Sequence, residues 1–201
     1  MQVTINDQNL PVDFSPFQSL EEVIQEIHER FIPPGHQLFQ VRINGEFFSE
    51  RYPREARYVE VKEISRLEVK TLSDEEMARF FLQDAIRQAD TLLEGMDRCA
   101  LLFRVGSEEE ANHRFAQVAE ALRWLLQTGE HACRVLQPDR EKIFSGRVSL
   151  SRYLSGLADL LEEMWEILED EDYVMLADLM EYELMPMVRE WQTILQKIAG
   201  H

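Results

Sequence analysis

Apolar residues recur at helical spacing through the second part of the chain, most clearly in its last segment. From Asp172 to Ala199 an apolar side chain falls at nearly every third or fourth position, which predicts one long amphipathic helix. The stripe consists of Ala177, Met180, Leu184, Met187, Trp191, Ile194, Leu195 and Ile198. Because such an apolar face must be covered, we expect the three preceding helical segments to pack against it.

Those three segments have recognisable start and stop signals. Ser73–Glu76 and Ser107–Glu110 are capping boxes, in which a serine oxygen and a glutamate satisfy amide groups at a helix start. Val105-Gly106 ends the first predicted helix, and Pro138 ends the second. The third predicted helix runs from about Leu150 to Leu168.

The apolar stripes of these helices define the expected core of an all-α domain. Four amphipathic helices joined mostly by short links predict an antiparallel four-helix bundle over residues 73–201. The expected core positions on the first three helices are Met77, Phe81, Ala85, Leu92, Met96, Cys99, Ala100, Phe103, Phe115, Val118, Leu122, Leu125, Leu126, Cys133, Leu136, Leu150, Tyr153, Leu154, Leu157, Leu161, Met164, Trp165 and Leu168.

Residues 1–72 have a different pattern, in which apolar and polar side chains alternate over short runs. A capping box at Ser19–Glu22 starts the single helix expected there, and Asn44-Gly45 is a strong signal for a two-residue hairpin turn. The predicted strands are Gln2–Asn6, Leu10–Phe14, Leu38–Ile43, Phe47-Phe48, Tyr58–Glu63 and Arg66–Leu72. This order of strands and helix predicts a β-grasp, and the whole chain is predicted to be α+β.

Four features of this segment resemble ubiquitin. Met1-Gln2 opens a hairpin, and the helix ends before Pro33-Pro34. Gln37-Leu38 leads a strand to Gly45, and Ile64–Val69 closes the sheet. The resemblance covers about a third of the chain and implies a ubiquitin-like β-grasp domain over residues 1–72, followed by the acidic helical domain.

Two departures from ubiquitin change what this resemblance implies. Ubiquitin-like modifiers end in a free Gly-Gly tail, whereas Thr71-Leu72-Ser73 continues here into a helix, so conjugation is not expected. The positions that align with ubiquitin's apolar partner-binding patch include Arg42 and Lys70. We expect these two residues to dock the first domain against the acidic helices; the alternative is two solvated basic residues on an exposed sheet face.

The charge of the chain is strongly acidic and unevenly distributed. The formal net charge is −17, and residues 73–201 carry −13 of it. Between Asp159 and Glu190 there are 12 acidic residues and a single basic one, Arg189. Such a field repels phosphate groups, so neither nucleic acid nor a membrane surface is an expected partner. It is typical of a solvated helical face, or of a surface for a basic partner.

The sequence contains few candidate catalytic or metal-binding patterns. Glu110 and His113 form a Glu-x-x-His pair, which metal-binding bundles use, but the chain has one copy and Glu110 also serves a capping box. Glycine-rich phosphate loops and zinc-hydrolase motifs are absent. Cys99 and Cys133 are expected to be buried thiols of a cytoplasmic protein. We therefore expect no metal, no cofactor and no enzymatic activity.

Pro186 is the most unusual residue of the last predicted helix. A proline inside a helix removes one donor and crowds the carbonyl four residues earlier, so we expect a kink between Tyr182 and Pro186, or a break into two helices. Methionines surround this position, and Met-rich surfaces can adapt to partners. Our expected partner-binding residues are Tyr182, Met185, Pro186 and Met187, although methionine at helical spacing also suits a core.

These patterns predict a non-enzymatic cytoplasmic protein-interaction module, an adaptor or assembly factor, that uses the surface around the kinked last helix. One alternative is an acidic chaperone of the secretion type that holds a helix of an export substrate. Another is a metal-binding helical bundle. The long connection Pro138–Ser149 would also permit helix exchange between two copies, so a homodimer stays open.

Overall fold

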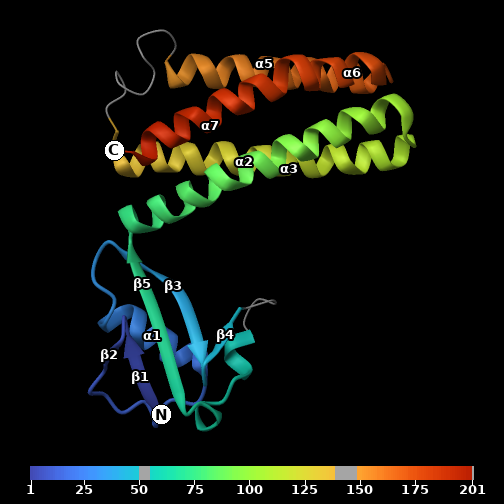
Figure 1. Ribbon diagram of the computed structural model, residues 1–201. Helices are drawn as coiled ribbons and strands as arrows, with labels where there is room; N and C mark the ends of the chain where they lie inside the picture. Colours follow the sequence, from blue (N-terminus) through green and yellow to red (C-terminus); the bar gives the residue numbers. More distant parts are fainter. Residues whose placement is uncertain (50–54, 139–148, 201) are drawn as a thin grey trace. The chain divides into compact units, whose positions relative to one another are not determined.

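The computed structural model describes residues 1–49, 55–138 and 149–200 (Figure 1). The fold is α+β, with a five-stranded mixed sheet at the N-terminus followed by helices, which confirms the predicted fold class at this level. The chain divides into two compact units, Met1–Met77 and Ala78–His201. Most of the predicted connection Pro138–Ser149 lies outside the described residues.

The sheet of the first unit has the strand order β2-β1-β5-β3-β4. Its strands are β1 (Gln2–Ile5), β2 (Gln8–Asn9), β3 (His36–Ile43), β4 (Glu46–Phe48) and β5 (Arg66–Ser73). β1 and β5 pair in parallel, and the other neighbours pair in antiparallel fashion. The turns before β2 and β4 place Asn6, Asp7, Asn44 and Gly45 at positive φ, as two-residue hairpin turns of this hand require.

One helix, α1 (Leu20–Arg30), packs against this sheet. Ser19 caps its N-terminus by accepting a hydrogen bond from the amide of Glu22, as predicted. The helix buries Leu20, Val23 and Ile27. Alternating residues of the strands supply the other side of this core, so the second face of the sheet carries polar side chains.

Two predicted strands are wrong. Leu10–Phe14 continues the first hairpin only as far as the amide of Leu10, which donates to the carbonyl of Val3 at 2.9 Å, because Pro11 has no amide hydrogen to donate. Tyr58–Glu63 lies beside the start of α1, where the amide of Leu20 donates to the carbonyl of Val59. Most of this segment forms two 3₁₀ turns instead of a strand of the sheet.

The second unit is built from helices whose predicted bounds are close to the observed ones. They are α2 (Asp74–Val105), α3 (Glu108–Leu136), α5 (Leu150–Glu169), α6 (Tyr173–Leu179) and α7 (Met185–Ala199). Ser107 and Ser149 cap α3 and α5 through their side-chain oxygens. Among the described helices, none is both long and apolar enough to cross a membrane.

The last predicted helix contains one irregular segment. Residues Met180–Leu184 form a π-helical turn between α6 and α7, and the amide of Met185 bonds the carbonyl of Met180 five residues earlier. Pro186 therefore stands in the first turn of α7, where its missing amide hydrogen costs little. The widened turn therefore accommodates Pro186 within the last helical segment.

α7 is the helix on which the others converge. The Trp191 indole nitrogen donates to the carbonyl of Leu125 on α3 at 3.4 Å. The Tyr153 hydroxyl on α5 donates to the carbonyl of Met187 at 2.5 Å. Gln192 donates to the carbonyl of Ile86 on α2 at 3.0 Å. The predicted stripe of this helix is largely buried, with Trp191 only 1% exposed.

Three core positions expected on the earlier helices are wrong. Met77 is half-buried and is not among the residues that pack against the helical core, while Phe81 and Trp165 are exposed. In α2 the buried positions follow a regular spacing through Ala78, Leu82, Ala85, Ala89, Leu92 and Met96. Phe81 lies about 100° around the helix from Leu82 and so points away from the core.

Candidate functional site

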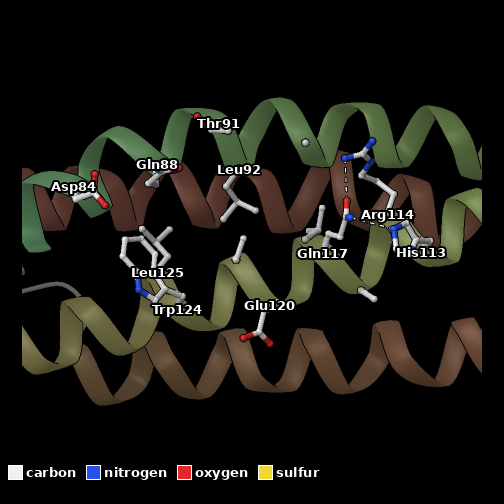
Figure 2. A pocket seen from close by; sticks show the side chains of 14 residues that line it. Asp84, Gln88, Thr91, Leu92, His113, Arg114, Gln117, Glu120, Trp124 and Leu125 are labelled. Atoms are coloured by element: carbon white, nitrogen blue, oxygen red, sulfur yellow. Dashed lines mark hydrogen bonds between the residues drawn. The ribbon is translucent and has the colours of Figure 1, made fainter. Parts of the chain in front are cut away.

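One concave surface of the helical unit is a groove between α2 and α3, which we call the α2–α3 groove (Figure 2). It has a volume of about 810 Å³. Its lining residues are Asp84, Gln88, Thr91, Leu92, Gly95, His113, Arg114, Ala116, Gln117, Val118, Glu120, Ala121, Trp124 and Leu125. On α2 these positions span about three helical turns.

The floor of the groove is apolar and its rim is polar. Leu92, Val118 and Leu125 are buried below it, and small residues keep the space above them open. Trp124 is 36% exposed. Its side chain lies at one end of the groove, as Figure 2 shows. An apolar floor with a polar rim is the usual composition of a surface that binds an amphipathic helix.

Hydrogen bonds organise the other end of the groove. The Arg114 guanidinium donates to the amide oxygen of Gln117 at 3.0 Å, and the amide nitrogen of Gln117 lies 3.1 Å from His113 Nε2. Figure 2 shows these three side chains together on α3. They are exposed or half-buried, so a ligand lying in the groove could exchange these bonds for its own.

Gly95 on α2 lines the groove and has no side chain that would fill it. A Cβ atom at this position would lie 4.0 Å from Val118 Cγ2, which is ordinary van der Waals contact. A larger side chain would therefore fit the backbone of α2 and project into the groove. Gly129 on α3 is the opposite case, because a Cβ there would lie 2.4 Å from the Trp191 ring. Gly129 is thus required for the packing of α7.

The predicted partner-binding residues around Pro186 have mixed environments. Tyr182 is 70% exposed and Pro186 is exposed as well. Met187 is half-buried, whereas Met185 is only 6% exposed and belongs to the core. The exposed surface at this place is therefore formed by Tyr182, Glu183 and Pro186, without the methionine side chain of residue 185.

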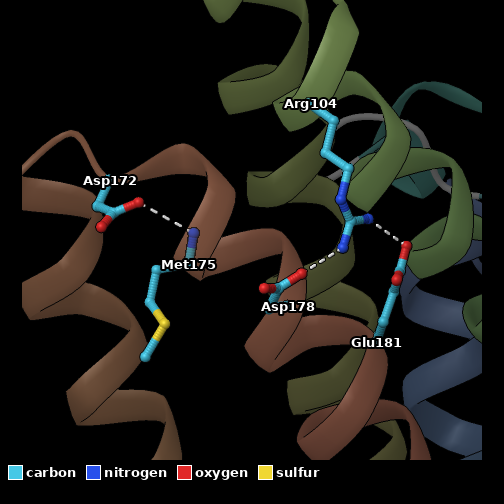
Figure 3. Close-up of polar contacts among 5 residues, drawn as sticks. All are labelled: Arg104, Asp172, Met175, Asp178 and Glu181. Carbon is cyan, nitrogen blue, oxygen red and sulfur yellow. Dashed lines mark hydrogen bonds and ion pairs between the residues drawn. The ribbon is translucent and has the colours of Figure 1, made fainter.

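Arg104 links the end of α2 to the irregular part of the last helical segment (Figure 3). Its guanidinium donates to Glu181 and Asp178, both at 2.5 Å. The hydrogen bond to Glu181, followed by that to Asp178, raises the pKa of Arg104. At the start of α6, the Asp172 carboxylate caps the helix by accepting a hydrogen bond from the amide of Met175 at 3.0 Å. These contacts hold the π-helical turn in place.

Arg42 and Lys70 lie on neighbouring strands, on the face of the sheet opposite α1. In the β3–β5 pairing, Arg42 is opposite Glu68 and Lys70 is opposite Gln40. The guanidinium of Arg42 lies 4.0 Å from the ring centroid of Phe47 on β4. Their proposed role in docking the two units stays a prediction.

The sequence-predicted chemical residues are spread over the helical unit. Glu110 takes part in the capping of α3, where its amide donates to Ser107, and His113 lies at the rim of the α2–α3 groove. Among the described residues, no group of three His, Cys, Asp or Glu side chains is placed to hold a metal ion. Cys99 and Cys133 do not form a disulfide bond, and burial raises the pKa of Cys99 to about 11.

The sequence expectations did not include the groove or its tryptophan. Trp124 falls between Leu122 and Leu125 but off the buried stripe of α3. A helical projection that also marks large apolar residues outside the main stripe would have singled it out. The groove forms because small side chains face each other on α2 and α3. The spacing of apolar residues along one helix does not reveal such a combination.

The fold and the groove define a class, an α+β protein in which an acidic helical unit with an open apolar groove follows a small mixed sheet. The family model described as "Domain of unknown function (DUF8042)" matches residues 81–194, more than half of the chain, and the chain belongs to this family. A second model, "Domain of unknown function (DUF8043)", matches residues 2–72. No curated protein and no solved structure matches the chain.

Proposed function

We propose that this chain is a non-enzymatic protein-interaction module, an adaptor or assembly factor, whose helical unit binds an amphipathic helix of a partner protein. The observation that carries the proposal is the α2–α3 groove, which combines an apolar floor, a polar rim and the exposed indole of Trp124. Aromatic side chains at the edge of an apolar groove are frequent anchors of protein interfaces.

The dimensions and the charge of the unit favour a helix with basic flanks as the ligand. The groove follows two antiparallel helices over about three turns, and a third helix can lie along such a surface. On its rim, Asp84 and Glu120 are paired with Arg87 and Arg123, and Arg114 also lines the groove. The acidic charge therefore belongs to the unit as a whole and not to the rim. Basic residues beside the apolar stripe of the partner would accelerate association with such a surface.

The reactive side chains of the described core support binding rather than catalysis. Burial raises the pKa of Cys99 to about 11 and also raises the pKa of Tyr153, so both groups stay protonated near neutral pH. A protonated buried thiol is a poor nucleophile. The absence of a disulfide between Cys99 and Cys133 also agrees with a cytoplasmic location, which we include in the proposal.

At the level of the fold, we propose that residues 1–72 form a ubiquitin-like β-grasp and that residues 73–201 form a four-helix bundle. The mixed sheet with α1 on one face supports the first part. The contacts of α7 with α2, α3 and α5 support the second part, if α6, the π-helical turn and α7 are counted as one interrupted helix.

The experiment compares capture by the wild-type chain with capture by Gly95→Leu. Leucine at this position fits the backbone but fills the groove, so we expect the partner captured by the wild type from lysate to be lost while thermal stability is kept. Gly156→Leu is the matched control, because a Cβ at Gly156 meets nothing within 4 Å and this position on α5 is outside the groove.

Three outcomes bear on the proposal. A partner retained by Gly156→Leu and lost by Gly95→Leu supports groove binding. Equal capture by both variants contradicts it. Capture of one aggregation-prone export substrate at fixed stoichiometry would replace the adaptor role with that of a secretion-type chaperone.

The surface formed by Tyr182, Glu183 and Pro186 is a second candidate for the same function. The observation in its favour is the π-helical turn at Met180–Leu184, because such turns are frequent at functional sites. Tyr182→Ala tests it in the same capture experiment. Loss of the partner in Tyr182→Ala but not in Gly95→Leu would assign the interaction to this surface.

A further inference from the structure

A smaller concave surface lies where α3 begins and α5 ends. It does not include Trp124, the exposed tryptophan of the α2–α3 groove. It has a volume of about 370 Å³. We call it the acidic aromatic pocket, and its chemically distinctive lining residues are Glu108, Asn112, Trp165, Glu169, Glu171 and Tyr173. No lysine, arginine or histidine lines it.

Packed aromatic rings hold the pocket in shape. Trp165 makes an edge-on contact with Phe115, with ring centroids 5.7 Å apart. Tyr173 stacks on Phe103 at 5.6 Å, and Phe103 in turn contacts Phe115 at 5.9 Å. Despite these contacts Trp165 is 52% exposed, so much of its indole is available to a ligand. A large exposed ring held by packed neighbours is preorganised for binding.

The polar groups of the pocket are mostly hydrogen-bond acceptors. The Glu108 carboxylate accepts a hydrogen bond from the Tyr173 hydroxyl, which raises the pKa of Tyr173. Asn112 Oδ1 is buried and accepts no hydrogen bond within the described part of the chain. Glu108, Glu169 and Glu171 form no ion pair among the described residues. Acceptors and negative charge beside aromatic rings suit a ligand that is cationic and rich in donors.

Glu171 reaches the pocket from a backbone position that is unfavourable for glutamate. Its φ is 58°, in the left-handed region, within the short turn between α5 and α6. Glycine or asparagine usually occupies such a position, because a Cβ atom is crowded there. Replacement of Glu171 by glycine therefore removes a carboxylate from the pocket without a steric cost to the fold.

We propose that the acidic aromatic pocket binds an arginine side chain of a protein partner. A planar guanidinium can stack on the Trp165 indole while its five donors reach the surrounding carboxylates and the free Asn112 oxygen. An ammonium group lacks the planar face, so lysine is expected to bind less tightly. This inference rests on the proposed protein-binding function in one respect, namely that the arginine belongs to a partner protein. The pocket itself is a different site from the α2–α3 groove.

The indole signals of the three tryptophans in ¹⁵N-labelled protein test this proposal. Trp165 reports on the pocket, Trp124 on the groove and Trp191 on the buried core. The probes are a short arginine-containing peptide, the same peptide with neutral citrulline in place of arginine, its lysine counterpart, free arginine and calcium ions. We expect the arginine peptide to shift the Trp165 signal in a saturable manner, with at least tenfold weaker binding of the citrulline peptide.

Two variants complete the test. Glu171→Gly should weaken the arginine peptide about threefold to tenfold without lowering the melting temperature. Glu163→Gln removes a charge from an exposed position of α5 outside the pocket and should change the affinity by less than twofold. A general effect of net charge would weaken binding equally in both variants, which would contradict a specific site.

Each remaining outcome also decides the matter. The proposal is wrong if citrulline and arginine peptides bind alike, if Trp165 does not respond, or if calcium ions produce the same shift at lower concentration. If free arginine binds as tightly as the peptide, the ligand of the pocket is a small molecule and not a side chain of a protein partner. A peptide that shifts Trp124 alone would leave the groove proposal intact while this one fails.

Discussion

Two glycines on neighbouring helices have opposite roles at the scale of single residues. Gly129 leaves room for the Trp191 ring, whereas Gly95 faces the open α2–α3 groove. We expect Gly129→Ala to destabilise the helical unit by about 1–3 kcal/mol, the usual cost of forcing a methyl group into a packed core. Gly95→Ala should stabilise it by about 0.5–1 kcal/mol, because alanine restricts the unfolded chain and favours a helix.

Urea unfolding followed by helical circular dichroism measures both changes, since most helical residues belong to the second unit. If Gly129→Ala is neutral or stabilising, Trp191 does not pack against the α3 backbone as described. The opposite signs of the two alanine variants make each a control for the other.

The buried thiol of Cys99 makes stability depend on pH in the alkaline range. Burial raises its pKa from 9.0 to about 11, so in this window the unfolded chain loses the proton first. The stabilisation is complete below about pH 9 and is lost as the pH rises towards 11, by up to about 3 kcal/mol. The difference in unfolding free energy between wild type and Cys99→Ala, measured from pH 8 to pH 11, should shrink accordingly. A difference that stays constant would mean that Cys99 is accessible to water.

The burial of a side chain could be predicted where apolar residues follow a regular helical spacing. It could not be predicted where two adjacent apolar residues could each occupy the buried position. Trp191 was placed correctly in the core because it lies on an uninterrupted stripe. Phe81 and Trp165 are exposed, because the regular spacing of buried positions passes through their neighbours Leu82 and Met164. The exposed Trp165 is also the central residue of the acidic aromatic pocket, so the prediction that it is buried concealed a candidate site.

At the scale of elements, the π-helical turn at Met180–Leu184 determines by how much Pro186 lowers the free energy of unfolding. In a regular helix interior a proline costs about 3 kcal/mol. Because Pro186 follows a widened turn and begins α7, we expect Pro186→Ala to stabilise the unit by less than that amount. Chemical unfolding measures the change. A gain of 3 kcal/mol or more would show that the turn does not accommodate the ring, and a loss would show that the ring supports packing.

Arg104 is the element-scale link between α2 and the π-helical turn, through Asp178 and Glu181. We expect Arg104→Gln to lower the melting temperature more than Arg98→Gln, whose exposed partner Glu94 lies 3.7 Å away on the same helix. Two close charge-assisted bonds to another element restrain more of the structure than one loose pair within a helix. The two variants should become more alike at high salt. Equal effects at low salt would contradict the proposed link.

Helices were easier to predict than strands because their ends carry local chemical signals. Ser107 and Ser149 cap α3 and α5 with their own side chains, so each helix start is encoded within a few residues. Tyr58–Glu63 alternates like a strand, but its backbone bonds the start of α1, more than 35 residues away. Pairing with a distant segment is not visible in local alternation.

At the scale of the whole molecule, the strong acidic charge leaves the class of partner open. A net charge of −17 is typical of a solvated helical face, or of a surface for a basic partner, and the basic partner stays a prediction. The α2–α3 groove arises only when α2 and α3 lie side by side with small residues such as Gly95 between them. The boundary between Met77 and Ala78 separates the regions matched by the two family models.

Site-specific photo-cross-linking of the retained partner tests the central claim most directly. A photoreactive amino acid at Gln117 lies on the rim of the α2–α3 groove, and one at Ser155 lies on an exposed position of α5 outside it. Groove binding predicts cross-links from position 117 to one amphipathic helix of the partner and none from position 155. Cross-links from position 155 without any from position 117 would contradict the account.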